Sequence, residues 1–220
     1  MLQINQKLVP AGAKNNPNKN MPAVDYITIH NTGNYEASAT AKMHVDYQYN
    51  GSGGREASWH YTVDADSVWQ SFDDRRMCWH AGDGAGPGNT TSIGIEICVN
   101  DKANFARACD NAAQLAAALL HRHGLTVDRV VQHNHWSGKN CPAEIRSGVW
   151  GVTWEQFLQA VRTYFAPPVP DADTPSSWAV KEGSWQWAIA AGVTDGKRPK
   201  ATCTREEVAA MIYRAVGHKG

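Results

Sequence analysis

Short strand-like segments alternate with long amphipathic segments over the first 165 residues of this 220-residue chain. Segments that are rich in β-branched or aromatic residues and bounded by turn residues predict strands. These segments are YITIH (26–30), HYTVD (60–64), SVWQSF (67–72), SIGIEIC (92–98) and RVVQH (129–133). Strands interleaved with helices indicate an α/β layer structure, in which helices cover a sheet.

Apolar residues at helical spacing predict the helices that cover this sheet. The segments with this spacing are residues 39–49, 104–123 and 153–164. Gly124 ends the second helix, and Thr153 with Gln156 has the spacing of a capping box at the start of the third. The 60–64 and 67–72 strands are so close in sequence that they must form an antiparallel hairpin. We therefore expect an α/β fold with a central mixed β-sheet flanked by helices.

A proline-rich segment, APPVPDADTPSS at residues 166–177, predicts a linker between two domains. Residues 1–165 then form the main domain, and residues 178–220 form a small module of two helices. In the module, Thr204 and Glu207 have the spacing of a second capping box. A module this small usually needs outside help to fold, so we expect it to pack against the main domain or against another copy.

Composition excludes several classes of function. The 21 Lys and Arg residues balance the 21 Asp and Glu residues, so the chain lacks the basic excess of a nucleic-acid binder. No apolar run is long enough to span a membrane. The first 20 residues lack the apolar core of a secretory signal, so we expect synthesis in the cytoplasm without a signal peptide. Five scattered cysteines argue against a disulfide framework and leave a thiolate free to bind a metal.

Four residues at or near predicted strands have side chains suited to metal-dependent hydrolysis. His30 ends one strand, His133 ends another, and Cys141 follows eight residues later. Two imidazoles and one thiolate are ligands that catalytic zinc uses, with a fourth position left for water. Glu96 is the lone acid of an apolar strand and has the chemistry of a general base. His135 is an alternative to His133, and a structural role for each residue is the competing interpretation.

The order of five sequence blocks indicates a family. Residues 25–165 resemble the type-2 N-acetylmuramoyl-L-alanine amidases, a zinc family that includes phage lysins and peptidoglycan recognition proteins. The matching blocks are ITIHNTG, SWHYTVD, CWHAGDG, NTTSIGIEIC and VVQHNHWSGKNCP. The resemblance implies a mixed sheet flanked by helices, with a shallow zinc cleft. Several blocks that match in order are more specific than any single short motif.

The resemblance also implies roles for individual residues. It places the zinc ligands at His30, His133 and Cys141, the catalytic acid/base at Glu96 and an assisting cation at Lys139. Recognition proteins of the family that lack the cysteine bind peptidoglycan without cutting it, so Cys141 favours catalysis.

Three more residues lie in blocks that line the cleft in relatives. These residues are Trp59, His60 and His80, and we expect them to contact substrate; packing is the competing interpretation.

The function that follows is hydrolysis of the bond between N-acetylmuramic acid and L-alanine in bacterial peptidoglycan, by water that Zn²⁺ activates. The alternatives are a noncatalytic peptidoglycan-binding module and a zinc peptidase that acts within the stem peptide. Without a signal sequence, the layout favours an endolysin that reaches the wall by holin-assisted release over a host autolysin exported by a nonstandard route.

The last segment carries a second resemblance. WAIAAGVTDG followed by TREEVAAMIYRA resembles a single, rearranged S-layer-homology unit. Such units bind cell-wall polymers, usually as several copies. We expect residues 178–220 to bind a secondary cell-wall polymer or to form a homo-oligomer.

Overall fold

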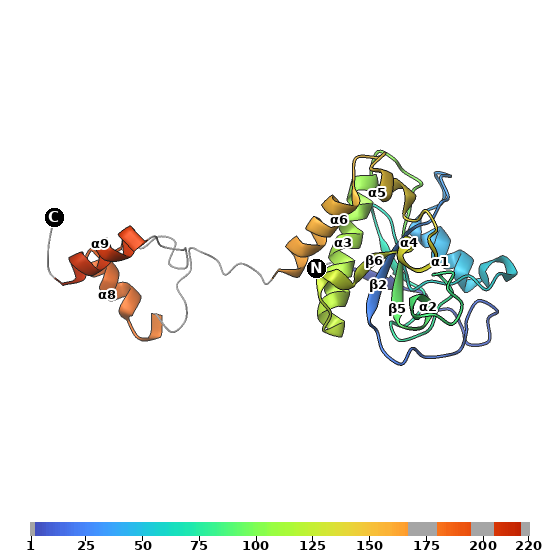
Figure 1. The fold of residues 1–220 in the computed structure, drawn as a ribbon, viewed down its shortest axis with the longest axis horizontal. Helices are drawn as coiled ribbons and strands as arrows, with labels where there is room; N and C mark the ends of the chain where they lie inside the picture. The colour runs from blue at the N-terminus through green and yellow to red at the C-terminus, as the bar shows by residue number, and fades with distance from the viewer. Residues whose placement is uncertain (1–2, 167–179, 195–204, 217–220) are drawn as a thin grey trace. The chain divides into compact units, whose positions relative to one another are not determined.

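The computed structural model describes residues 3–166, 180–194 and 205–216 of the chain. The chain divides into two compact units, Met1–Phe165 and Ala166–Gly220 (Figure 1). The predicted linker at residues 166–177 lies outside the described residues except for Ala166. Within those residues, no helix combines the length and the apolar character that a membrane span requires.

The first unit is built on a mixed sheet of six strands in the order β1-β4-β3-β5-β2-β6. The strands are β1 (Ile4–Gln6), β2 (Tyr26–Asn31), β3 (Tyr61–Val63), β4 (Val68–Gln70), β5 (Ser92–Ile97) and β6 (Val130–Gln132). The β3–β4 pair is the predicted antiparallel hairpin, and the other neighbouring strands run parallel. The predicted mixed sheet is confirmed. Strand β1, which pairs with β4 at one edge, was not predicted from the sequence.

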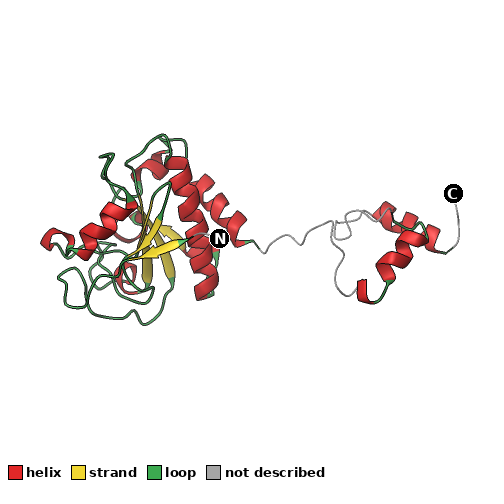
Figure 2. Cartoon of the chain, turned by 180° about the vertical axis from the view of Figure 1, so that it is seen from behind, coloured by secondary structure: helices red, strands yellow, loops and turns green. Residues whose placement is uncertain are grey.

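Helices lie on either side of the sheet (Figure 2). They are α1 (Ala41–Tyr49), α2 (Pro87–Thr90), α3 (Phe105–His123), α4 (Asn134–Ser137), α5 (Ala143–Ser147) and α6 (Trp154–Phe165), with 3-10 turns η1 (Ser52–Gly54) and η2 (Val127–Arg129). The capping box that opens α6 is present: the Thr153 amide donates to Gln156 Oε1, and the Gln156 amide donates to Thr153 Oγ1. Gly124 ends α3 in the left-handed conformation, with φ of 65°.

One face of the sheet is apolar and packs against α3, which in turn packs against α6 (Figure 1). Alternate side chains of β2 and β5 supply this face, and all of them are fully buried: Ile27, Ile29, Ile93, Ile95 and Ile97. Leu115 and Leu119 of α3 belong to the same core. Each such buried side chain contributes roughly 1.5–3 kcal/mol, so this face anchors the sheet.

The opposite face of the same strands is polar. Side chains alternate between the two faces of a strand, so the residues between the isoleucines point away from α3. The register places His30 of β2 beside Glu96 of β5, and Glu96 beside Thr62 of β3. The packing that buries the isoleucines therefore fixes a row of polar side chains on the other side.

The second unit contains two described helices, α8 (Ser184–Ala190) and α9 (Arg205–Ala215). Both lie within the segments predicted to be helical. The loop between them falls largely outside the described residues, as does Thr204 of the predicted capping box. Large apolar side chains in this unit are exposed, including Trp187, Ile189 and Ile212.

Candidate metal centre and active site

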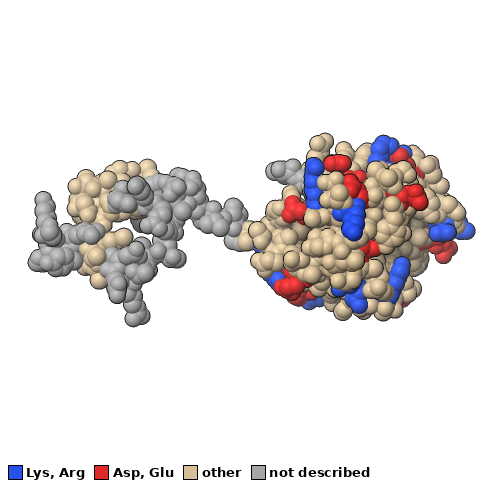
Figure 3. Space-filling view, turned by 90° about the horizontal axis from the view of Figure 1, so that it is seen from above, with Lys and Arg blue, Asp and Glu red and all other residues tan. Residues whose placement is uncertain are grey.

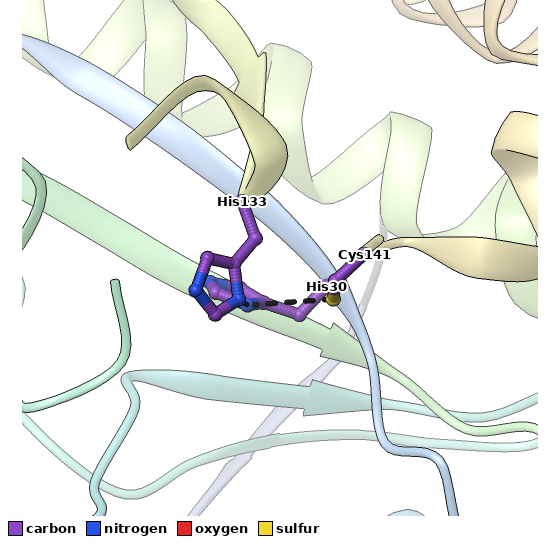
Figure 4. A group of neighbouring side chains, drawn as sticks. All are labelled: His30, His133 and Cys141. Carbon is purple, nitrogen blue, oxygen red and sulfur yellow. Dashed lines mark hydrogen bonds between the residues drawn. The ribbon is translucent and has the colours of Figure 1, made fainter. Parts of the chain in front are cut away.

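Two histidines and a cysteine from separate segments meet on the polar face (Figure 4). His30 comes from β2, His133 follows β6, and Cys141 lies between α4 and α5. The Nδ1 atoms of the two histidines are 3.0 Å apart, and Cys141 Sγ is 3.9 Å from His30 Nδ1. All three residues are buried, and one potential ligand atom from each lies within 4.8 Å of the others. The structure thus brings together the three residues that the sequence suggested as ligands.

Backbone hydrogen bonds explain how the chain places these ligands. The His133 amide donates to the Ile29 carbonyl at 3.1 Å, which keeps His133 beside β2. The chain then turns into α4, and the Asn134 amide donates to the Cys141 carbonyl at 3.0 Å. The Asn134 side chain donates to the Lys139 carbonyl at 2.9 Å. These bonds fold the loop after α4 back toward β6 and set Cys141 next to His133.

His135, the alternative ligand, does not join the cluster. Strand β6 ends before His133 and α4 begins at Asn134, so the chain turns between the two histidines. His135 is exposed, and its ring contacts Trp136 with a centroid distance of 4.5 Å. The turn into α4 therefore places His133, and not His135, in the cluster.

Glu96 lies beside the cluster. Its Oε1 is 3.9 Å from His30 Nδ1, and no hydrogen-bond partner for its Oε2 exists in the described part of the chain. Burial raises the pKa of Glu96 to about 8, although the Lys139 ammonium opposes this rise. A carboxyl group with such a pKa exchanges protons readily near neutral pH.

A groove of 670 Å³ is lined by residues close in sequence to the cluster, among them Thr32, two residues after His30, and Lys139, two residues before Cys141. Its lining consists of Thr32, Asn34, Met43, His44, Tyr47, Gly53, Arg55, Ala57, Trp59 and Lys139. The indole of Trp59 is half-buried, and its Nε1 donates to Thr62 Oγ1 at 2.7 Å. Thr62 is the residue of β3 that is paired with Glu96 of β5. Two of the predicted site residues, Trp59 and Lys139, thus belong to the lining of the groove.

His60 does not fit the expected contact with substrate. The side chain is fully buried, its Nδ1 accepts a hydrogen bond from the Gly94 amide at 3.0 Å, and its Nε2 lies 2.7 Å from the Arg76 carbonyl. Burial lowers the pKa of His60 to about 4, so the ring is neutral at pH 7. Both ring nitrogens of His60 therefore have partners inside the protein, and His60 is not part of the groove lining.

His80 is also placed differently from the expectation. It is 9% exposed, and its Nδ1 lies 3.0 Å from His30 Nε2, on the side of that ring away from Cys141. Burial lowers the pKa of His80 to about 3. His80 therefore lies behind a candidate ligand instead of lining the groove.

The sequence analysis missed one contact that joins the two ligand-bearing loops. The Tyr35 hydroxyl, five residues after His30, donates to the carboxylate of Glu144, three residues after Cys141. Glu144 is buried although Tyr35 is 58% exposed. Nothing in the spacing of these residues indicates the contact, because it depends on how α5 packs. The remaining described cysteines, Cys78, Cys98 and Cys109, are buried free thiols as expected.

A family model described as N-acetylmuramoyl-L-alanine amidase matches residues 19–144. The chain is similar to N-acetylmuramoyl-L-alanine amidase XlyA of Bacillus subtilis (strain 168), at 41% identity over 161 residues, 73% of this chain and 52% of that protein. It is also similar to N-acetylmuramoyl-L-alanine amidase CwlH of the same organism, at 38% identity over 169 residues, 76% of this chain and 64% of that protein. The match thus spans about half to two thirds of these relatives.

Solved structures have the same fold as the first unit. The catalytic domain of XlyA superposes with a TM-score of 0.66 at 40% identity and covers 73% of this chain and 99% of that chain. The structure of PlyL superposes with a TM-score of 0.65 at 32% identity and covers 73% of this chain and 97% of that chain. The central mixed sheet with flanking helices is therefore the fold of this group of amidase domains.

Proposed function

The chain belongs to the N-acetylmuramoyl-L-alanine amidase family, and from this premise we propose that it is a peptidoglycan hydrolase that cleaves the amide bond between N-acetylmuramic acid and L-alanine. The observation that carries the proposal is the position of Glu96. It is paired with His30 on the neighbouring strand, and His30 belongs to the His30–His133–Cys141 cluster. Metal-assisted hydrolysis needs side chains that hold the metal and an acidic group beside them that transfers protons. The groove lined by Thr32 and Lys139, each two residues from a candidate ligand, would receive the substrate.

His30, His133 and Cys141 would hold a zinc ion. A tetrahedral zinc site with bonds of about 2.0–2.3 Å to nitrogen and sulfur separates its ligand atoms by roughly 3.3–3.8 Å. The separations of 3.0 and 3.9 Å around His30 Nδ1 are close to this range. Thiolate together with imidazole suits zinc better than calcium or magnesium. When bound, zinc lowers the pKa of a water molecule to about 7 and polarises a carbonyl group.

Glu96 would act as the proton-transfer group. Its Oε2 is buried and has no hydrogen-bond partner among the residues that the structure describes, so this atom is free to accept a proton from water. The same carboxyl group would then deliver the proton to the nitrogen of the departing L-alanine. Because burial raises the pKa of Glu96, the group both gains and loses a proton at little cost near neutral pH.

Lys139 and Trp59 would act on the substrate from the groove. Lys139 is exposed; its positive charge opposes the rise that burial causes in the pKa of Glu96 and adds to the fall that burial causes in the pKa of His133. A cation here would stabilise the negative charge that develops on the lactyl carbonyl oxygen. The indole of Trp59 offers a flat face to a sugar or peptide group. Its hydrogen bond to Thr62 keeps that face in place.

The site of action would be the bacterial cell wall. We propose that the protein is an endolysin that reaches the wall by holin-assisted release. The second unit, Ala166–Gly220, would bind a secondary cell-wall polymer or mediate homo-oligomerisation. Its exposed Trp187 and Ile212 support a role in contacts with other molecules.

Two substitutions test the proposal by separating chemistry from metal binding. We expect Glu96→Ala to keep zinc and to lose about 10²–10⁴-fold in turnover, because general acid–base catalysis typically contributes that factor. We expect Cys141→Ser to lose both zinc and activity, since a hydroxyl is a poor replacement for a thiolate ligand. Metal analysis and release of soluble peptides from purified peptidoglycan measure the two effects.

Two outcomes of these experiments would contradict the proposal. Full activity of Glu96→Ala contradicts the assignment of the proton-transfer group. Binding of peptidoglycan by the wild-type protein without any product would place the chain among noncatalytic recognition proteins.

A further inference from the structure

His80 connects the candidate ligand His30 to the backbone of the sheet. Its Nε2 lies 3.2 Å from the Ser92 carbonyl oxygen, and its Nδ1 lies 3.0 Å from His30 Nε2. The rings of His30 and His80 meet edge to face, with an interplanar angle of 83°. His80 therefore lies between the first residue of β5 and the cluster on the polar face.

The chemistry of these contacts fixes the direction of each hydrogen bond. The Ser92 carbonyl oxygen is only an acceptor, so His80 Nε2 must carry the proton. A neutral imidazole has one protonated nitrogen, which leaves His80 Nδ1 as an acceptor. His30 Nε2 must then be the donor to His80. The lone pair of His30 consequently lies on Nδ1, the atom that faces His133 and Cys141.

The surrounding chain is shaped to keep His80 in this place. A Cβ atom at Gly94 would lie 2.9 Å from His80 Cγ and 3.0 Å from its Nδ1, closer than packing allows. The glycine in β5 thus makes room for the ring. On the backbone side, the amide of His80 donates to Asn89 Oδ1 at 2.8 Å, and the Ala81 amide donates to the same oxygen.

We infer that His80 is a positioning residue that sets the tautomer and the ring orientation of His30 for metal binding. The inference rests on the zinc site of the proposed function. It replaces the expectation that His80 contacts substrate. Groups that hold a metal-ligating histidine in this way typically change metal affinity by about 10–100-fold when they are removed.

The tautomer of His30 in the metal-free wild-type protein gives the most direct test. Nitrogen NMR of the imidazole rings distinguishes a protonated from an unprotonated ring nitrogen. We expect His30 to carry its proton on Nε2 and to leave Nδ1 unprotonated. A proton on Nδ1 would overturn the inference, and this measurement needs neither a variant nor an active enzyme.

Variants then test the effect on the metal. We expect His80→Ala to weaken zinc binding about 10–100-fold in a chelator competition. His80→Asn should restore most of the affinity, because its side-chain oxygen can stand near the position of Nδ1 and accept from His30. His60→Ala is the control, since it removes another buried imidazole, one that accepts a hydrogen bond from the Gly94 amide and has no contact with a candidate ligand among its hydrogen bonds. We expect its zinc affinity to stay near that of the wild type.

Failure of the inference and failure of the proposed function give different results. If folded His80→Ala binds zinc as tightly as the wild type, the inference is wrong and the hydrolase proposal is untouched. If the wild type binds zinc through a His30 of the expected tautomer but releases no product, the hydrolase proposal fails and the inference stands. Should His80→Ala not fold, the wild-type tautomer and the affinity of His80→Asn still decide the matter.

Discussion

Lys139 is the residue whose charge bears most directly on the proposed chemistry. It is exposed and lines the groove beside Glu96. We expect Lys139→Met to reduce kcat by about 10²–10³-fold with a small change in KM, because removal of one group that stabilises an oxyanion typically has this effect. Lys102→Met removes an exposed lysine that does not line the groove and serves as the control. Steady-state kinetics on a soluble muramyl peptide measure both parameters, and an unchanged kcat would exclude Lys139 from the transition state.

At the level of single residues, the sequence predicted that His30, His133 and Cys141 come together. It did not predict the contacts that His60 and His80 make. His30, His133 and Cys141 could be proposed because strand ends and ligand chemistry point to them. His60 and His80 could not be assigned, since both follow a tryptophan in similar blocks and the sequence does not show which face of the chain each occupies. Their roles depend on contacts with Gly94 and Ser92, which come from a strand further along the chain.

At the level of elements, Asp74 ties the hairpin of β3 and β4 to the end of α3. It accepts hydrogen bonds from Tyr61 of β3 and, at 2.8 and 3.0 Å, from Arg122 and His123 of α3. Burial alone would raise the pKa of Asp74, but these three hydrogen bonds outweigh it and lower the pKa. The carboxylate therefore stabilises the fold above its unfolded pKa of about 3.9. This contribution is lost as the pH falls through the lower, folded value.

This arrangement predicts a pH-dependent difference between the wild type and Asp74→Asn. At pH 7 we expect the variant to unfold with a free energy lower by about 1.5–3 kcal/mol, the usual contribution of hydrogen bonds to a charged group. Below pH 4 the difference should narrow, because the wild-type carboxylate becomes protonated. Urea denaturation at several pH values checks this, and a constant difference down to pH 2 would show that charge is not involved.

The elements with strong local patterns were predicted, but β1 and the short helices α2, α4 and α5 were not. The alternating residues of β5, the apolar spacing of α3 and the capping box of α6 are local features, so the sequence sufficed. Strand β1 has only three residues, and its pairing with β4 depends on a segment more than 60 positions away. Helix α4 begins almost directly after β6, and this turn separates His133 from His135.

At the scale of the whole molecule, the first unit contains every residue of the proposed site. We expect residues 1–165 alone to hydrolyse a soluble muramyl peptide within a few-fold of the full chain, since the core and the cluster lie within this unit. On intact cell walls the truncated protein should sediment less with the wall if the second unit binds it. Loss of activity on the soluble peptide in a folded fragment would contradict this division of roles.

The size-exclusion profile of the same fragment separates the two roles proposed for the second unit. Reduced adsorption to the wall with an unchanged oligomeric state favours a wall-binding module. A shift from oligomer to monomer favours self-association. The sequence predicted the helices of this unit. Two such helices are compatible with both wall binding and self-association, so the sequence does not distinguish these two roles.

Basic and acidic side chains balance over the whole sequence, with 21 of each. Basic and acidic side chains are interspersed over the visible face of the first unit (Figure 3), as the equal totals in the sequence suggest. A single-sign field that would attract nucleic acid is not present on that face.

The bond that the protein cuts in intact peptidoglycan is the most direct test of the account. Purified peptidoglycan is incubated with the full chain, with the chain after chelation, and with the chelated chain after zinc is returned. Mass spectrometry identifies the soluble products. We predict intact stem peptides with a free L-alanine amine, released from unbroken glycan by the untreated and the zinc-restored protein only. Products cut within the stem, or the same products in the presence of chelator, would contradict the account.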